Sequence, residues 1–189
     1  MKFKDLRRRI KTPFFSTYQV EKLFLEEPKN QIDNQLSRMA ARGDLTKLKR
    51  SLFAFQDRQI DELMLANWLY RPSYVSLESA LNLYGLMPDV SANLTSVSPT
   101  TSKKIITGFG TFLYSKINFR LFFGFSQVES GQSGLFYDLA FPEKALLDYI
   151  YIRKIKDLEE NRIETANFDR KKLAELAQFY PLWVRKVIQ

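Results

Sequence analysis

The chain has 189 residues, of which 45% are hydrophobic and 14% aromatic, so it carries enough apolar material for an ordinary folded core. It contains no cysteine and no histidine, which excludes disulfides, the usual structural zinc sites, cysteine nucleophiles and histidine acid–base schemes. The net charge of +8 is concentrated in residues 1–60, which hold 14 Lys and Arg against 7 Asp and Glu. A basic segment followed by a nearly neutral one predicts that the basic segment binds a polyanion.

No apolar stretch approaches the roughly 20 residues of a membrane span, and the basic start "MKFKDLRRRIKTPFF" lacks the apolar segment of a signal peptide. We therefore expect a cytoplasmic protein without a membrane partner.

Three helices are expected in the basic segment. Residues 3–10 place Phe3, Leu6 and Ile10 at helical spacing. The second helix begins with a capping box, Ser16 followed by Gln19, and is expected to end at the proline of "EEPKN". The third helix runs from about residue 30 to 42 and stops at a glycine, which takes the left-handed conformation without strain.

The third helix divides into an apolar and a polar side. Ile32, Leu36, Met39 and Ala40 form one apolar stripe. The opposite side carries short amide and hydroxyl side chains together with arginine. Amides suit the edge of adenine, the guanidinium group suits guanine, and small residues allow close approach to the floor of the major groove.

Two short strands are expected next, at residues 45–48 and 52–55, around the basic turn "KRS". Three helices followed by a basic hairpin is the order of a winged helix-turn-helix, in which the third helix enters the major groove and the wing lies near the backbone. The candidate DNA-binding residues are Lys29, Asn30, Asn34, Ser37, Arg38, Arg42, Lys47, Lys49 and Arg50. The alternatives are a solvated polar surface and a protein-interaction module.

The expected organisation is a winged helix at residues 1–58, a connecting helix or linker at 59–72, and a larger domain at 73–189. The larger domain begins with a helix from Ser76 to Gly85, continues with four or five short strands, and returns to helix at Pro142. The fold class is therefore α+β, with a mainly antiparallel sheet flanked by helices in the larger domain.

Sequence motifs for chemistry are scarce, because the phosphate-binding loop and the dinucleotide fingerprint are absent. Asp138, Glu143 and Lys144 allow a nuclease-like metal site as an alternative. The same stretch, "AFPEKALLDYI", also fits the first turns of a helix, with Lys144 and Asp148 paired along its surface. We favour the helix, and expect no enzyme activity, no cofactor and no metal.

The larger domain resembles the AbiEi family of antitoxins from type IV toxin–antitoxin (abortive infection) systems. The resemblance lies in the ordered motifs "YVSLESALNLYGLMPD", "TSVSPTTSKKIITGFGTFLYSKI", "LFFGFSQVE" and "LAFPEKALLDYIY", and it covers roughly residues 73–152. The segment "FDRKKLAELAQFY" is also similar to the family, whereas the N-terminal winged helix matches in type rather than in motif.

The resemblance implies an antitoxin that binds inverted repeats in its own promoter and represses a two-gene operon. It also implies a functional partner, a nucleotidyltransferase-like toxin, that is counteracted without a stable complex. Two other functions remain open from the residues: a winged-helix regulator whose larger domain binds a ligand or partner, and the metal-dependent nuclease. The residues discussed above are compatible both with a monomer on each half-site and with a dimer that spans both half-sites.

Overall fold

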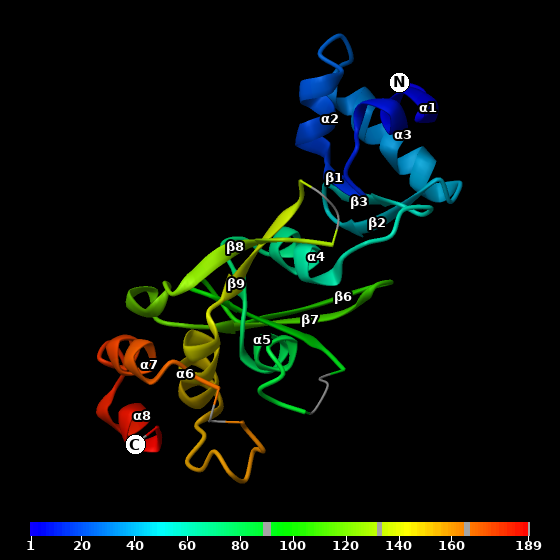
Figure 1. The fold of residues 1–189 in the computed structure, drawn as a ribbon. Coiled ribbons are helices and arrows are strands. Elements are labelled where there is room, and N and C mark those ends of the chain that lie inside the picture. Colours follow the sequence, from blue (N-terminus) through cyan, green and yellow to red (C-terminus); the bar gives the residue numbers. More distant parts are fainter. Residues whose placement is uncertain (89–91, 132–133, 165–166, 189) are drawn as a thin grey trace. The chain divides into compact units, whose positions relative to one another are not determined.

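The computed structural model describes residues 1–88, 92–131, 134–164 and 167–188 (Figure 1). The chain divides into two compact units, Met1–Ile60 and Asp61–Gln189. Both units combine helices with strands, so the α+β class is confirmed.

The smaller unit contains three helices and a three-stranded antiparallel sheet (Figure 1). Its elements in chain order are α1 (Phe3–Arg9), β1 (Phe14–Ser16), α2 (Thr17–Leu23), α3 (Lys29–Ala41), β2 (Leu45–Lys49) and β3 (Leu52–Phe55). The strands lie in the order β1-β3-β2. The short strand β1 was not expected from the sequence, because three residues give no measurable alternation.

Local signals set the helix ends in this unit. Ser16 Oγ accepts a hydrogen bond from the backbone N–H of Gln19, whose side chain accepts one from the backbone N–H of Ser16, which confirms the capping box. Helix α3 ends in a Schellman motif at Gly43, which has a φ of 83°. The expected end of α2 at the proline was wrong. The helix stops at Leu23 because Phe24 leaves the helical conformation, and Pro28 instead caps α3.

Apolar side chains from all three helices and the sheet meet in one core. Leu6 of α1, Ile32 and Leu36 of α3, and Phe15 and Phe55 of the sheet are all fully buried. The rings of Phe15 and Phe55 lie 5.0 Å apart. Arg58 also ties the ends of this unit together, because its guanidinium donates to the carbonyl oxygens of Arg7, Ile10 and Thr12.

The larger unit is built on a six-stranded mixed sheet in the order β6-β7-β5-β4-β9-β8. Its strands are β4 (Tyr74–Val75), β5 (Leu94–Ser98), β6 (Lys103–Thr107), β7 (Gly110–Lys116), β8 (Phe125–Glu129) and β9 (Phe136–Ala140). Its helices are α4 (Glu62–Leu69), α5 (Leu77–Leu83), α6 (Pro142–Arg153), α7 (Arg170–Ala177) and α8 (Leu182–Val187), with a 3-10 turn, η1, at Phe119–Leu121.

The described part of residues 94–141 forms five strands, within the expected number, and β4 adds a sixth; the sheet is mainly antiparallel, as expected, but not wholly so. Three strand pairings are antiparallel, but β4 pairs with β9 and β5 pairs with β7 in parallel. Composition and alternation identify a strand without revealing the direction of its neighbour, so the parallel pairings could not be expected. The two-residue strand β4, which joins β5 to β9, is likewise too short to give a pattern.

Helices pack on this sheet and on each other. Asp61 caps α4 through the backbone N–H groups of Leu63 and Met64, and α4 contacts β4, β5 and β9. Helix α5 ends in a second Schellman motif at Gly85 and packs against both β5 and α6 (Figure 1). Helix α6 has Pro142 in its first turn, as expected.

The expected surface pairing of Lys144 with Asp148 was wrong. The two residues do form an ion pair one turn apart, but both side chains are fully buried. Eight consecutive residues of α6, Glu143–Ile150, are buried, so the helix is enclosed on all sides and has no solvent-facing stripe over these turns.

Candidate nucleic-acid interface

The smaller unit exposes all nine residues that the sequence suggests for DNA contact. Six of them lie on α3 or immediately after it, and three lie on β2 or in the turn that follows; they are Lys29, Asn30, Asn34, Ser37, Arg38, Arg42, Lys47, Lys49 and Arg50. The unit therefore presents them to solvent, on two adjoining elements.

The outward ridge of α3 is formed by Asn30, Asn34 and Ala41. Successive helical residues are rotated by about 100°, so these three lie opposite the buried side chains of Ile32 and Leu36. The ridge therefore carries two amides and a methyl group, without a bulky side chain among them. Such a ridge can approach base edges closely and offer both donors and acceptors to them.

One flank of α3 faces the β2–β3 turn across an open pocket of about 370 Å³. Cationic and hydroxyl side chains from three elements line this pocket, including Lys29, Ser37, Lys47, Arg50 and the exposed Tyr18 of α2. Tyr18 was missed by sequence reasoning, since an aromatic residue in a helix is usually buried. The structure thus brings four of the candidate residues together, and we call this pocket the turn-side pocket.

Two carboxylates also line the turn-side pocket, Glu21 and Asp33. Lys29 Nζ lies 3.4 Å from Glu21 Oε1, so one of the candidate cations is partly neutralised within the pocket. The pocket accordingly offers polyanions a weaker positive field than its cations alone would give.

The basic turn between β2 and β3 is short and anchored. Arg50 and Ser51 alone connect the paired residues Lys49 and Leu52, and Ser51 has a φ of 61°. The carbonyl oxygen of Ser51 accepts a 3.0 Å hydrogen bond from the backbone N–H of Thr17 at the start of α2. The position of the turn is therefore coupled to the helix that precedes α3.

The other flank of α3 borders a separate open pocket of about 310 Å³, lined by Met1, Lys2, Phe3, Gln35, Arg38, Met39 and Arg42. Arg42 is also paired with Asp44, whose Oδ2 lies 3.1 Å from Nε and 2.8 Å from Nη2. Lys2 was missed by sequence reasoning, because only the tertiary packing of α1 brings it beside α3. We call this the α1-side pocket.

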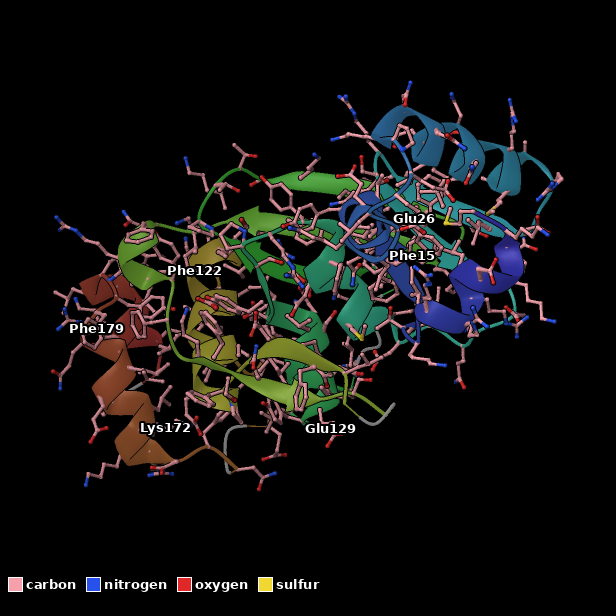
Figure 2. The ribbon with its side chains drawn as sticks, turned by 90° about the horizontal axis from the view of Figure 1, so that it is seen from above. Phe15, Glu26, Phe122, Glu129, Lys172 and Phe179 are labelled. Atoms are coloured by element: carbon pink, nitrogen blue, oxygen red, sulfur yellow. The ribbon has the colours of Figure 1, made fainter. Side chains whose placement is uncertain are left out.

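The residues weighed as a nuclease-like site engage different partners in the larger unit. The backbone N–H of Asp138 donates to the side chain of Asn67, and burial raises the pKa of the Asp138 carboxyl, opposed by Arg71. Glu143 accepts from the backbone N–H of Asp169 at 3.2 Å and lies 3.2 Å from the ammonium group of Lys172, which is labelled in Figure 2. No group of three or more metal-ligating side chains occurs within the described ranges of the chain.

Lys144 belongs instead to a buried polar cluster of five residues, Tyr74, Ser76, Lys144, Asp148 and Tyr180. Lys144 Nζ donates to Tyr74 at 2.9 Å, to Tyr180 at 2.6 Å and to Asp148. Asp148 also accepts from the hydroxyl groups of Tyr74, Ser76 and Tyr180 at 2.8, 2.9 and 2.6 Å. All three ammonium protons and both carboxylate oxygens are thus engaged, as burial requires.

The buried cluster is enclosed by aromatic rings and shifts the ionisation of its members. Phe122, marked in Figure 2, lies against the Tyr74 ring at a centroid distance of 5.2 Å. Burial lowers the pKa of Lys144, and the charge of Asp148 opposes this change. Burial and the negative charge of Asp148 raise the pKa values of Tyr74 and Tyr180. With every member at most 1% exposed, the cluster offers no surface to a substrate.

Neither protein-family models nor curated protein sequences give a match to this chain. The resemblance to the AbiEi antitoxins therefore depends on the ordered motifs quoted above. Within the described residues, no helix is both long and apolar enough to cross a bilayer.

Proposed function

We propose that residues 1–60 form a winged helix-turn-helix that binds double-stranded DNA. The observation that carries the proposal is α3 itself, a 13-residue helix with an exposed amide ridge and cations along both flanks. The element order α1-β1-α2-α3-β2-β3 and the sheet order β1-β3-β2 support it, because they put a short hairpin directly after the helix that would enter the major groove.

We propose further that the protein is an antitoxin and autorepressor of the AbiEi type, acting in the cytoplasm. The ordered motifs of the larger domain support this, and two of them form neighbouring parts of one structure. Gly124 of "FFGF" packs directly against Lys144 of "PEKALLD". In this proposal the winged helix represses the promoter, and the larger domain counteracts a nucleotidyltransferase-like toxin without forming a stable complex.

The repressor activity is tested by a gel shift on the DNA immediately upstream of the gene, at moderate salt, against random duplexes of equal length. We expect a preference of at least a thousandfold for the upstream DNA, in the range of specific regulators. Equal affinity for both would contradict repression. The antitoxin activity is tested by co-expression with an adjacent nucleotidyltransferase-type gene, whose toxicity should be relieved by this protein.

A second candidate is a winged-helix regulator whose larger domain binds a small ligand. It is favoured by an open pocket of about 830 Å³ in the larger unit, within the size range of ligand sites. Apolar residues such as Leu146 and Phe168 line it together with the cations Lys156, Arg170 and Arg185. Absence of a toxin gene beside this one, together with ligand-dependent release of DNA, would favour this candidate over the antitoxin.

A further inference from the structure

We infer that Lys2, Arg38 and Arg42 form a second phosphate-binding site, in the α1-side pocket, for the DNA strand opposite the one that meets the β2–β3 turn. This inference depends on the proposed DNA binding and adds to it: α3 would be held from both sides of the major groove.

The composition of the α1-side pocket favours a phosphate. Its lining includes three cationic side chains and one amide, Gln35; no carboxylate lines it, although Asp44 neutralises part of the charge of Arg42 and Glu27 pairs with the amino group of Met1. The turn-side pocket, in contrast, contains Glu21 and Asp33 beside its cations. A phosphodiester carries one negative charge and accepts hydrogen bonds only, so the α1-side pocket suits it better than the turn-side pocket does.

The backbone around Lys2 is fixed by its neighbours. Met1 and Phe3 pack against the core of the smaller unit, and the Phe3 ring lies 6.1 Å from that of Phe55. The carbonyl oxygen of Lys2 accepts hydrogen bonds of 3.1 Å from the backbone N–H groups of Asp5 and Leu6. Lys2 is therefore anchored through its main chain, while its side chain remains exposed at the rim of the pocket.

Arg38 and Arg42 lie one turn apart and share this side of α3. Arg42 is oriented by Asp44, which engages Nε and Nη2 and leaves the other guanidinium donors for a ligand. Arg38 is exposed, lies beside the ridge of Asn30 and Asn34, and lines the same pocket as Lys2. This inference places Arg38 on a phosphate, whereas the sequence analysis matched the arginine of this face to guanine.

The two pockets flank the ridge of α3, and this matches the geometry of a duplex. A helix in the major groove has one sugar–phosphate strand on each side. Lys47 and Arg50 are available to one strand, and Lys2, Arg38 and Arg42 to the other. Contacts on both strands fix the angle of the helix in the groove, which contacts on one strand leave free.

The test uses the full chain, upstream DNA and random duplex, with binding measured over a series of salt concentrations. In Lys2→Ala and in Arg42→Ala we expect the slope of log K against log salt to become shallower by about 1, on both DNAs alike. Lys4→Ala is the matched control, because Lys4 is exposed in the first turn of α1, two residues from Lys2, but does not line the pocket. Circular dichroism and thermal unfolding verify that each variant is folded.

Phosphate-ethylation interference locates the contact. With the unaltered protein we expect two clusters of sensitive phosphates, one on each strand, and Lys2→Ala should abolish one of them while leaving the other. If Lys2→Ala and Arg42→Ala both left the salt slope unchanged and retained both clusters of sensitive phosphates, the second phosphate site would be overturned, but DNA binding would not. Failure of the unaltered protein to bind any DNA would overturn the DNA-binding proposal itself.

Discussion

Gly124 lies so close to Lys144 that a Cβ atom at position 124 would be 3.0 Å from Cδ and 3.1 Å from Cγ of the lysine. Gly124 has a φ of 75°, a conformation that side-chain-bearing residues rarely adopt. The carbonyl oxygen of Gly124 also accepts a 3.0 Å hydrogen bond from the backbone N–H of Phe141, next to the start of α6. A side chain at this position would therefore combine an unfavourable backbone conformation with a displacement of the buried Lys144 side chain.

We expect Gly124→Ala to lower the free energy of unfolding by about 2–4 kcal/mol, because it combines backbone strain with crowding of a buried lysine. Gly85→Ala is the control. Gly85 has a similar φ of 70°, but no atom lies within 4 Å of its added Cβ, so this variant should show the strain of about 1–2 kcal/mol alone. Chemical denaturation measures both, and equal losses would show that the contact with Lys144 contributes nothing.

The buried tyrosines predict loss of stability in alkali. Burial raises the pKa values of Tyr74, Tyr114, Tyr137 and Tyr180 above 10. The unfolded chain loses these phenol protons near pH 10 while the folded chain keeps them, so stability is fully present below pH 10 and falls as the pH rises further. The pKa of Lys144 is lowered, so this one group has the opposite effect: it makes the folded state less stable as the pH falls below 10.5, the ordinary pKa of lysine.

Absorbance of tyrosinate at 295 nm measures this effect. In a folded sample near pH 11 we expect fewer than the nine tyrosines to ionise, with the remainder appearing together when the protein unfolds. Smooth ionisation of all nine with one ordinary pKa, before any unfolding, would contradict the enclosed environment of the cluster.

Glu21→Gln should strengthen DNA binding. The change removes a carboxylate from the turn-side pocket and releases Lys29 from its 3.4 Å ion pair. We expect tighter binding to all duplexes and a salt slope steeper by up to about 1, as Lys29 becomes available to a phosphate. Glu26→Gln, at an exposed position of the same unit outside the pocket (Figure 2), removes the same charge as a control. Equal gains in both would indicate a net-charge effect only.

Asn34→Ala should weaken specific binding by about 1–3 kcal/mol and leave binding to random duplex unchanged, because a base-reading amide contributes only at its own site. Gln56→Ala serves as a comparison, since Gln56 is exposed in the same unit but belongs neither to α3 nor to the lining of either pocket. Competition binding on the upstream DNA and on random duplex gives both numbers. A uniform loss on both DNAs would place Asn34 among the phosphate contacts.

Most parts of the fold that depend on neighbouring residues were predictable, the end of α2 being an exception. The capping box at Ser16, the glycine that ends α3 and the proline that opens α6 are all local signals, and the structure confirms each. The parts that depend on distant residues were not. The parallel partner of β5 lies beyond the intervening strand β6, and the burial of Lys144 requires hydroxyl groups from Tyr74 and Tyr180, far away in the chain.

The candidate interface follows the same division. Helical spacing was enough to predict the exposed side of α3 and its candidate residues, because one helix determines its own faces. The acidic lining contributed by Glu21, the exposed ring of Tyr18 and the approach of Lys2 all come from other elements. A count of charges along the sequence does not show which residues from other elements lie beside α3.

In the proposed complex with DNA, the length of the α3 ridge limits the number of base pairs that one copy of the protein contacts. From Asn30 to Ala41 the helix rises by about 16 Å, which spans roughly five base pairs. A given sequence of five base pairs recurs about once per thousand base pairs by chance. One copy would therefore not distinguish one promoter from the rest of a genome. In the proposed repressor, two copies on an inverted repeat would square that selectivity and would make repression depend steeply on the concentration of the protein.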